Sequence, residues 1–349
     1  MHLKTKINSL PVQTFSRLLV NGSEHDIIVP KRQKQAANIT KLPAGVLHAH
    51  ESVLKCAEFS SAMSEELAVL IQANASAGLS FRVPKGAAVR LPIEQEFDAA
   101  TTPVVSNVIY AEAGARVSVL LVYTGKAETA FFSTRVLAEN CAEVSVTEVF
   151  LSDGAVYGDF QSVLGNSASL RHNRIVMGMG SRYLGSFNRL SGSDCEAKSE
   201  IFYLCSDGVC DFNCINRHFA ANSKSELLAS GVLLGDAEKT FRGTLDFQPG
   251  SRGSVGAESE NVLILSDDAK NRSCPLVLCG EEDVDGSHSV SVGKIDAAKL
   301  YYMQTRGLSE AETKTLVSLG MLQSALSSVA NEKLEEKLKE TARAKIICA

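Results

Sequence analysis

Three cysteines lie close together in the middle of the chain, at Cys205, Cys210 and Cys214. Thiolates bind soft metals and iron–sulfur clusters, so this segment is a candidate ligand set. Its spacing, with four and then three intervening residues, differs from the Cys-x-x-Cys pairs of zinc and ferredoxin sites. On a strand, Cys210 and Cys214 would share one face, and Cys205 would lie across a turn. Small buried core residues are therefore the favoured interpretation, and metal ligation is the alternative.

A second segment of interest ends in His288. Pro275 opens an apolar strand, an acid-rich turn follows at 281–285, and the chain then reads Gly-Ser-His at 286–288. This neighbourhood sets His288 apart from the other histidines of the chain.

Motifs that would indicate catalysis are absent from the sequence. It contains no Gly-x-Ser-x-Gly, no Gly-x-x-x-x-Gly-Lys-Ser/Thr and no His-Glu-x-x-His. His172 and His218 fall on predicted strands with no carboxylate beside them in sequence, so each is interpreted as a surface or satisfied core histidine. We therefore predict that the protein is not an enzyme.

Composition narrows the class of partner and the compartment. The 349 residues carry a formal net charge of -5, which argues against binding to nucleic acid. No apolar run is long enough to cross a bilayer, and no export signal follows the N-terminal lysines, so a cytoplasmic location away from membranes is expected. The nine scattered cysteines then predict reduced thiols, most of them buried.

Regular turns occur between residues 78 and 290. Successive turns follow one another at a period of about 26 to 28 residues, which is in the range of solenoid repeats. Gly, Asn and Asp, which tolerate left-handed backbone, begin each turn. Each unit is long enough for two strands, and stacked units bury a core that none could bury alone. A β-solenoid is favoured over the alternative of a β-sandwich. The turns are Gly86-Ala87, Gly114-Ala115, Asn140-Cys141, Asn166-Ser167, Asp194-Cys195, Asn222-Ser223 and Gly250-Ser251.

Helical patterns flank this repeat on both sides. Helices are predicted at 49–54 and 64–73, within an otherwise irregular segment 1–77. The repeat itself is assigned to residues 78–293, and a helical C-terminal domain to 294–349.

Capping signals define the C-terminal helices. Asp296 is expected to cap a short helix that Gly307 ends, and Ser309 with Glu312 forms a capping box for the next. Asn331 caps the last helix. The apolar stripe of these helices either folds back on its own domain or receives a partner helix. The stripe consists of Leu316, Leu319, Leu322, Leu326, Val329, Leu334, Leu338 and Ala342.

The stretch from Pro275 to Gly307 resembles the closing segment of the SufB/SufD family of iron–sulfur cluster assembly proteins. The shared pattern is a proline, an apolar strand, an acidic pair with valine, a His-bearing turn, Val-Gly, an aromatic helix and Arg-Gly. The spacing from proline to histidine is preserved. Segments 232–245 and 261–269 are also similar to family motifs, and the opening 7–12 resembles short SufD-like members. The matching residues are Pro275, Glu282-Asp283-Val284, Ser287-His288, Val292-Gly293, Leu300-Tyr301-Tyr302 and Arg306-Gly307.

This resemblance implies a flattened right-handed parallel β-helix with a C-terminal helical domain. It also implies pairing with a SufB-like subunit, or with a second copy, through the β-helix. The C-terminal domain, with Tyr301, Tyr302 and Arg306, would dock a SufC-type ATPase. His288 would be an iron or cluster ligand at the subunit interface, and the partner would supply thiolate or carboxylate ligands to a transient, shared iron–sulfur cluster.

One position departs from the family pattern. SufD-type members often carry cysteine two residues before the histidine, where this chain has Gly286. A structural subunit that docks the ATPase without cluster ligands is therefore an alternative. A polysaccharide-active β-helix enzyme is a third interpretation, disfavoured because the chain has no line of acidic and basic residues along an exposed strand face.

Overall fold

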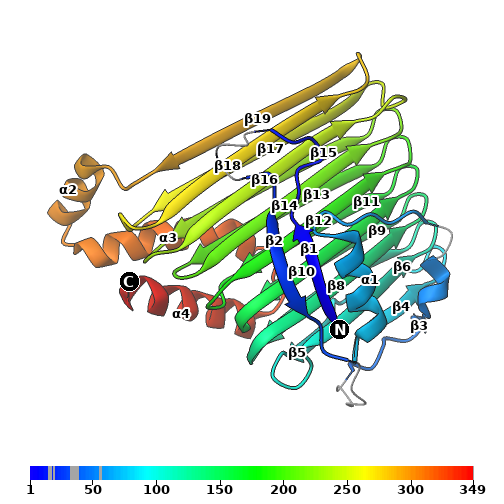
Figure 1. Ribbon diagram of the computed structural model, residues 1–349, viewed down its shortest axis with the longest axis horizontal. Helices are drawn as coiled ribbons and strands as arrows, with labels where there is room; N and C mark the ends of the chain where they lie inside the picture. Colours follow the sequence, from blue (N-terminus) through cyan, green and yellow to red (C-terminus); the bar gives the residue numbers. More distant parts are fainter. Residues whose placement is uncertain (15–17, 19, 32–38, 55–56, 349) are drawn as a thin grey trace.

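The computed structural model describes residues 1–349 except 15–17, 19, 32–38, 55–56 and 349. Two parallel sheets form its body, and the chain alternates between them, as Figure 1 shows. Eight pairs of strands give about eight turns of a β-solenoid. The predicted solenoid is therefore confirmed, and the sandwich is excluded because consecutive strands lie in different sheets while alternate strands pair in parallel.

The first sheet has nine strands. In spatial order it runs from β18 at one end to the short antiparallel β3 at the other. Its members are β3 (Leu47–His48), β4 (Ser80–Val83), β6 (Val104–Ala111), β8 (Lys126–Ala138), β10 (Asp153–Leu164), β12 (Arg182–Leu190), β14 (Val209–His218), β16 (Glu238–Phe247) and β18 (Lys270–Cys279).

The second sheet has eight strands, all parallel, from β19 to β5. Its members are β5 (Ile93–Asp98), β7 (Arg116–Thr124), β9 (Glu143–Phe150), β11 (Ser169–Val176), β13 (Glu196–Cys205), β15 (Lys224–Leu233), β17 (Ser254–Ile264) and β19 (Val284–Gly293).

The predicted turns connect a strand of one sheet to the next strand in the other sheet, and they have the expected left-handed backbone conformation. Six of the seven place a residue with φ between +53° and +69° in the predicted pair, and Gly250 in the seventh has φ +99°. In two pairs the second residue, Cys141 or Ser167, takes this conformation instead of the preceding asparagine. The asparagine side chains instead form hydrogen bonds between coils. The Asn140 side chain accepts a hydrogen bond from the backbone N–H of Asn166, one coil away, at 2.9 Å. The periodic turn chemistry thus stacks the coils.

The main hydrophobic core fills the space between the two sheets. Alternating residues of each strand point inward, as on β7, where Val117, Val119 and Leu121 are buried. Aromatic rings stack within it, with the ring centroids of Tyr123 and Phe132 4.1 Å apart.

The N-terminal segment covers the outer face of the nine-stranded sheet. An antiparallel hairpin, β1 (His2–Ile7) with β2 (Ser23–Ile28), and helix α1 (Glu65–Asn74) bury Ile7, Leu67 and Ile71 against Val104 and Phe131 of that sheet. Helix α1 confirms the predicted helix at 64–73, with Ser64 as its cap. The other predicted helix is only a 3₁₀ turn, η2 (Glu51–Leu54).

Helices α3 (Glu310–Leu326) and α4 (Glu332–Cys348) cover the outer face of the eight-stranded sheet. Their apolar stripe, including Leu322, Leu326 and Leu338, packs on residues such as Phe202 and Val232. The stripe therefore folds back on its own chain. Leu316 departs from the prediction, because it is exposed.

Capping in this region follows the sequence. Asp296 accepts a hydrogen bond from the N–H of Ala298 at the start of α2 (Ala297–Thr305), and Gly307 has φ +88°. Ser309 and Glu312 form both halves of the capping box of α3. Among the described helices, none is both long and apolar enough to cross a membrane.

Candidate functional site

The last coil, β18 with β19, leaves one end of the solenoid open. Within the part of the chain that the structure describes, each of these strands pairs with another strand on one side only, so its other edge carries backbone N–H and C=O groups that no strand pairs (Figure 1). Nearly all side chains of β19 are exposed, including the apolar Val290 and Val292. A flat edge with exposed valines is suited to pairing with another protein chain.

His288 lies in the middle of this last strand. In the parallel register its Cα is opposite Glu258 of β17, and Val290 is opposite Glu260. Glu258 and Glu260 point into the solenoid and are buried, so His288 occupies the corresponding inward face of the uncovered coil. The predicted ligand is thus at the open end, exposed, and directly above a buried carboxylate.

A buried polar cluster lies beneath His288. The Lys239 ammonium of β16 contacts Oε1 of Glu260, and its Nζ donates to Ser273 Oγ at 3.3 Å. The Tyr203 hydroxyl donates to the same Glu260 oxygen at 3.1 Å. Glu258 is 3 % exposed, and neither of its carboxylate oxygens has a hydrogen-bond partner among the described residues. The cluster therefore contains two carboxylates and one ammonium.

Burial sets the proton affinities in this cluster. Removal from water raises the pKa of Glu258 to about 8, and the neighbouring Glu260 charge adds to the rise while Lys239 opposes it. Burial lowers the pKa of Lys239, although Glu260 favours its charged form. A carboxyl group without a partner in such a place is costly when ionised unless a cation reaches it.

Gly243 on β16 makes room for the Glu258 side chain. A Cβ at this position would lie 2.2 Å from Oε1 of Glu258, so the carboxylate rests on the glycine backbone across the core. The next inward residue along the stack, Cys214 of β14, is opposite Gly243 in the register. Burial raises the pKa of the Cys214 thiol to about 11, so the thiol stays protonated near neutrality and is a poor ligand in that form.

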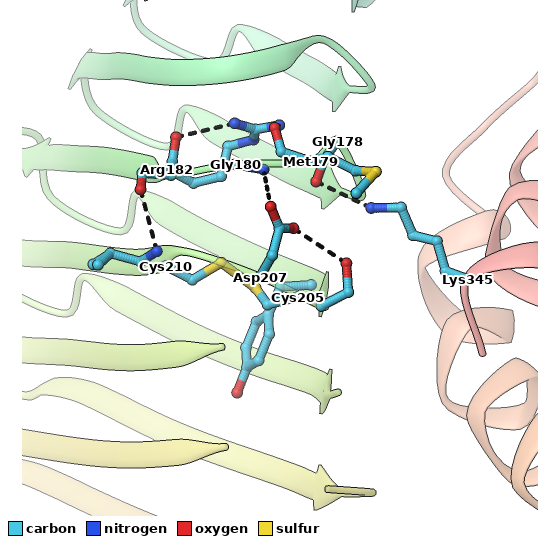
Figure 2. Close-up of a disulfide and its surroundings, with 12 residues drawn as sticks. Gly178, Met179, Gly180, Arg182, Cys205, Asp207, Cys210 and Lys345 are labelled. Carbon is cyan, nitrogen blue, oxygen red and sulfur yellow. Dashed lines mark hydrogen bonds between the residues drawn. A yellow bond between two sulfur atoms is a disulfide. The ribbon is translucent and has the colours of Figure 1, made fainter. Parts of the chain in front are cut away.

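The other two cysteines of the predicted set form a disulfide. Cys205 ends β13 and Cys210 lies in β14, with the turn 206–208 between them, and their sulfurs are bonded (Figure 2). The prediction that all cysteines are reduced is wrong for this pair, because the tight turn brings the two Cα atoms within 6.8 Å. Neither sulfur is a free thiolate here, while Cys210 and Cys214 do share the inward face as expected.

Polar contacts hold the turn beside this disulfide. Asp207 accepts a hydrogen bond from the N–H of Gly180 at 2.9 Å (Figure 2). The buried Arg182 guanidinium donates to the backbone carbonyl of Ser152 in the preceding coil and to that of Met179 in its own turn. Lys345 of α4 donates to the carbonyl of Gly178 at 3.2 Å. The disulfide thus lies where the C-terminal helices meet the solenoid edge, well away from His288 in the strand order.

Helix α2 carries the residues predicted to dock a partner. Tyr301 and Tyr302 are 70 % and 54 % exposed, and no residue of this helix is buried. The Arg306 guanidinium lies 5.3 Å from the centroid of the Tyr302 ring. The helix stands away from the solenoid, past the C-terminal end of β19 and beside α3 (Figure 1), so its aromatic side chains are available for contact with another protein.

Comparison with known proteins identifies the family. Residues 95–321 match the family model described as "SUF system FeS cluster assembly, SufBD core domain". The chain belongs to the SufBD family. The match begins in β5 and ends in α3, and so includes the open end and α2.

Curated SufBD relatives match shorter segments. The chain is 31% identical over 121 residues to the iron–sulfur cluster assembly protein SufD of Bacillus subtilis, which is 35% of this chain and 28% of that protein. It is 26% identical over 186 residues to the SufBD family protein ML0594 of Mycobacterium leprae, covering 51% of this chain and 47% of the relative. The matched segments thus span less than half of these relatives.

The SufBD core also contains a buried ionic group that sequence reasoning missed. Glu148 of β9 accepts hydrogen bonds from Arg174 Nε at 2.9 Å and from Thr134 Oγ1 at 2.8 Å, and it contacts His172 Nε2 at 3.1 Å. Burial alone would raise the pKa of Glu148, but the Arg174 charge and His172 hold it at about 2. Burial lowers the pKa of His172 to about 4, so the ring is neutral at pH 7.

A signal for this group was present in the sequence. Glu148 and Arg174 are register partners on adjacent strands, so one interval of the turn repeat separates them along the chain. His172 is a satisfied core histidine, as expected, but its partner comes from the neighbouring coil and not from nearby in sequence. His218 is likewise buried, between the hydroxyls of Ser223 and Ser225 at 2.8 Å each.

Proposed function

We propose that this SufBD chain is a scaffold subunit of a Suf-type iron–sulfur cluster assembly complex. In this proposal it pairs with a SufB-like subunit, or with a second copy of itself, and docks a SufC-type ATPase, while carrying out no catalysis of its own. The family match across residues 95–321 carries the proposal, because it covers the open end and the protruding helix together. The solenoid of 78–293 then serves for pairing and the segment 294–349 for docking.

Pairing is assigned to the open edge of β18 and β19. The edge offers a row of unpaired backbone groups and the exposed Val290 and Val292. A partner strand would satisfy the backbone groups and cover the valines, which is how strand addition supplies affinity. The nascent cluster is cargo at this junction. His288 is its ligand from this chain. The partner supplies thiolate or carboxylate ligands, because this chain has Gly286 at the position where SufD-type members often have a cysteine.

Removing the aromatic face of α2 should weaken docking of the ATPase. Replacing Tyr301 and Tyr302 together by alanine is expected to weaken binding of the co-expressed ATPase by at least about tenfold, because aromatic anchors dominate such interfaces. Pull-down of the ATPase with the tagged chain, followed by titration, measures the effect. Leu91→Ala is the matched control, since Leu91 is similarly exposed at the far end of the solenoid. Undiminished ATPase binding by the double variant would remove α2 from the docking surface.

His288→Ala tests the ligand assignment within the assembled complex. After reconstitution with iron and sulfide under argon, the variant complex is expected to retain roughly tenfold less cluster, as loss of a metal-site residue typically costs at least this much. Absorption in the visible range and iron analysis provide the measurement. Full cluster retention would favour the second candidate function, a structural SufBD subunit without ligands, which the glycine at 286 supports. Failure of any ATPase to co-purify with the wild type would overturn both.

A further inference from the structure

We propose that Glu258 is a second ligand of this chain, beside His288, for a divalent iron-class cation bound at the open end of the solenoid. This inference rests on the proposed function and deepens it, because it names a further residue of the same site and the chemistry that the residue contributes.

The strand register puts the two side chains next to each other. Glu258 and His288 are Cα partners on adjacent parallel strands and share the inward face. Neighbouring strands are about 4.8 Å apart. A cation with ligand bonds of about 2.1 Å holds two ligand atoms about 3 to 4 Å apart. The spacing of adjacent strands is close to that separation, so an imidazole turned inward can share a cation with the carboxylate.

Glu258 has no other role visible in its surroundings. Lys239, whose charge also favours the ionised form of Glu258, makes its direct contact with Glu260. Both oxygens of Glu258 and the second oxygen of Glu260 lack hydrogen-bond partners among the described residues. Buried charged groups in proteins are paired with an opposite charge or coordinate a metal. The two oxygens of Glu258 are therefore free to take a cation in place of a proton.

Only the last coil, β18 with β19, lies between the Glu258 carboxylate and the open end of the solenoid. Gly243, which makes room for the Glu258 side chain, is opposite Pro275 of β18, and Glu258 is opposite His288 of β19. Among the described residues no further coil lies above it, because β18 and β19 end their sheets. A cation held by the exposed imidazole thus has the buried carboxylate as its nearest inward neighbour.

The combination of ligands defines the class of cation. Imidazole nitrogen with carboxylate oxygen suits divalent iron, cobalt or zinc, whereas calcium and magnesium prefer oxygen alone and monovalent copper prefers sulfur. Among the described residues, no group of three or more His, Cys, Asp or Glu side chains forms a complete metal site. The remaining positions are thus left for water or for the partner across the open edge.

The test is titration of the purified chain with Co²⁺ under argon, monitored by calorimetry and by visible absorption. Wild type is expected to bind Co²⁺ saturably, and E258Q and H288A to bind it at least about tenfold more weakly, with a changed spectrum. E226Q is the matched control, because Glu226 is a half-exposed carboxylate on β15, paired with Lys198 outside the site. It should bind Co²⁺ like the wild type.

A second variant displaces the carboxylate without removing it. Gly243→Ala keeps the carboxylate but would place a methyl group 2.2 Å from its Oε1, so it should also weaken Co²⁺ binding. The melting temperatures of all variants report folding. Wild-type affinity in E258Q, or no saturable binding by the wild type, would overturn the assignment. If Co²⁺ binding does not depend on Glu258 but the chain still docks the ATPase, only the assignment of Glu258 as a ligand is wrong and the proposed function stands.

Discussion

Replacing Glu148 by glutamine is expected to destabilise the chain by about 3 to 5 kcal/mol, the usual cost of breaking a buried ion pair. Glu148 is 2 % exposed and neutralises Arg174, which is as deeply buried. The amide keeps the shape of the side chain and one acceptor oxygen, but it leaves the guanidinium without a counter-charge inside the core. Chemical denaturation of the two proteins at pH 7 measures the difference in the free energy of unfolding.

Glu143→Gln on the same strand is the matched control. Its carboxylate is 54% exposed and lies 3.0 Å from Arg116 at the surface. Exposed ion pairs contribute little, so this substitution should change the stability by less than about 0.5 kcal/mol. Equal stabilities of the Glu148 and Glu143 variants would show that the interior ion pair is not what holds this part of the solenoid together.

The architecture was predictable because its signal is local and repeated. Residues able to take left-handed backbone recur at each turn, and the structure shows that conformation in all seven predicted pairs. The helix caps at Ser64, Asp296 and Ser309 were equally local. Leu316 was misassigned because it lies on a different face of α3 from the buried Ser318, Leu322 and Ala325.

Contacts between coils were harder to predict, because they join residues far apart in sequence. The turn repeat already relates Glu148 to Arg174, yet it does so only after strand positions are known. At the open end, register partners such as Glu258 and His288 lie farther apart along the chain than Glu148 and Arg174 do. The turn spacing of the earlier coils therefore does not predict which residues are opposite each other there. The disulfide of Cys205 with Cys210 likewise depends on the shape of one turn.

A different buried carboxyl should make the stability of the chain depend on pH. Asp159 of β10 is buried beneath the N-terminal segment, where it accepts hydrogen bonds from Ser61 Oγ at 3.0 Å and from Gln161 Nε2 at 2.5 Å. Burial raises its pKa from 3.8 to about 7, against the opposing effect of these two donors and of Arg174. The folded chain therefore keeps this proton over a range in which the unfolded chain has lost it.

The sign of the effect follows from this difference in bound protons. Below pH 3.8 the carboxyl is protonated in both states. As the pH rises from there to about 7, only the folded state holds the proton, so the free energy of unfolding falls by about 1.4 kcal/mol per pH unit. The total loss attributable to Asp159 reaches at most about 4 kcal/mol and is complete once the folded group has ionised.

Asp159→Asn should abolish this loss. Asparagine retains an acceptor for Gln161 and does not titrate, so the variant is expected to match the wild type near pH 4 and to exceed its stability at pH 8 by up to about 4 kcal/mol. Denaturation at a series of pH values measures both curves. Asp236→Asn, in an exposed turn, controls for loss of one negative charge and should follow the wild-type curve. Parallel curves for Asp159→Asn and the wild type would mean that Asp159 is ionised in the folded chain, compensated by the donors and by Arg174.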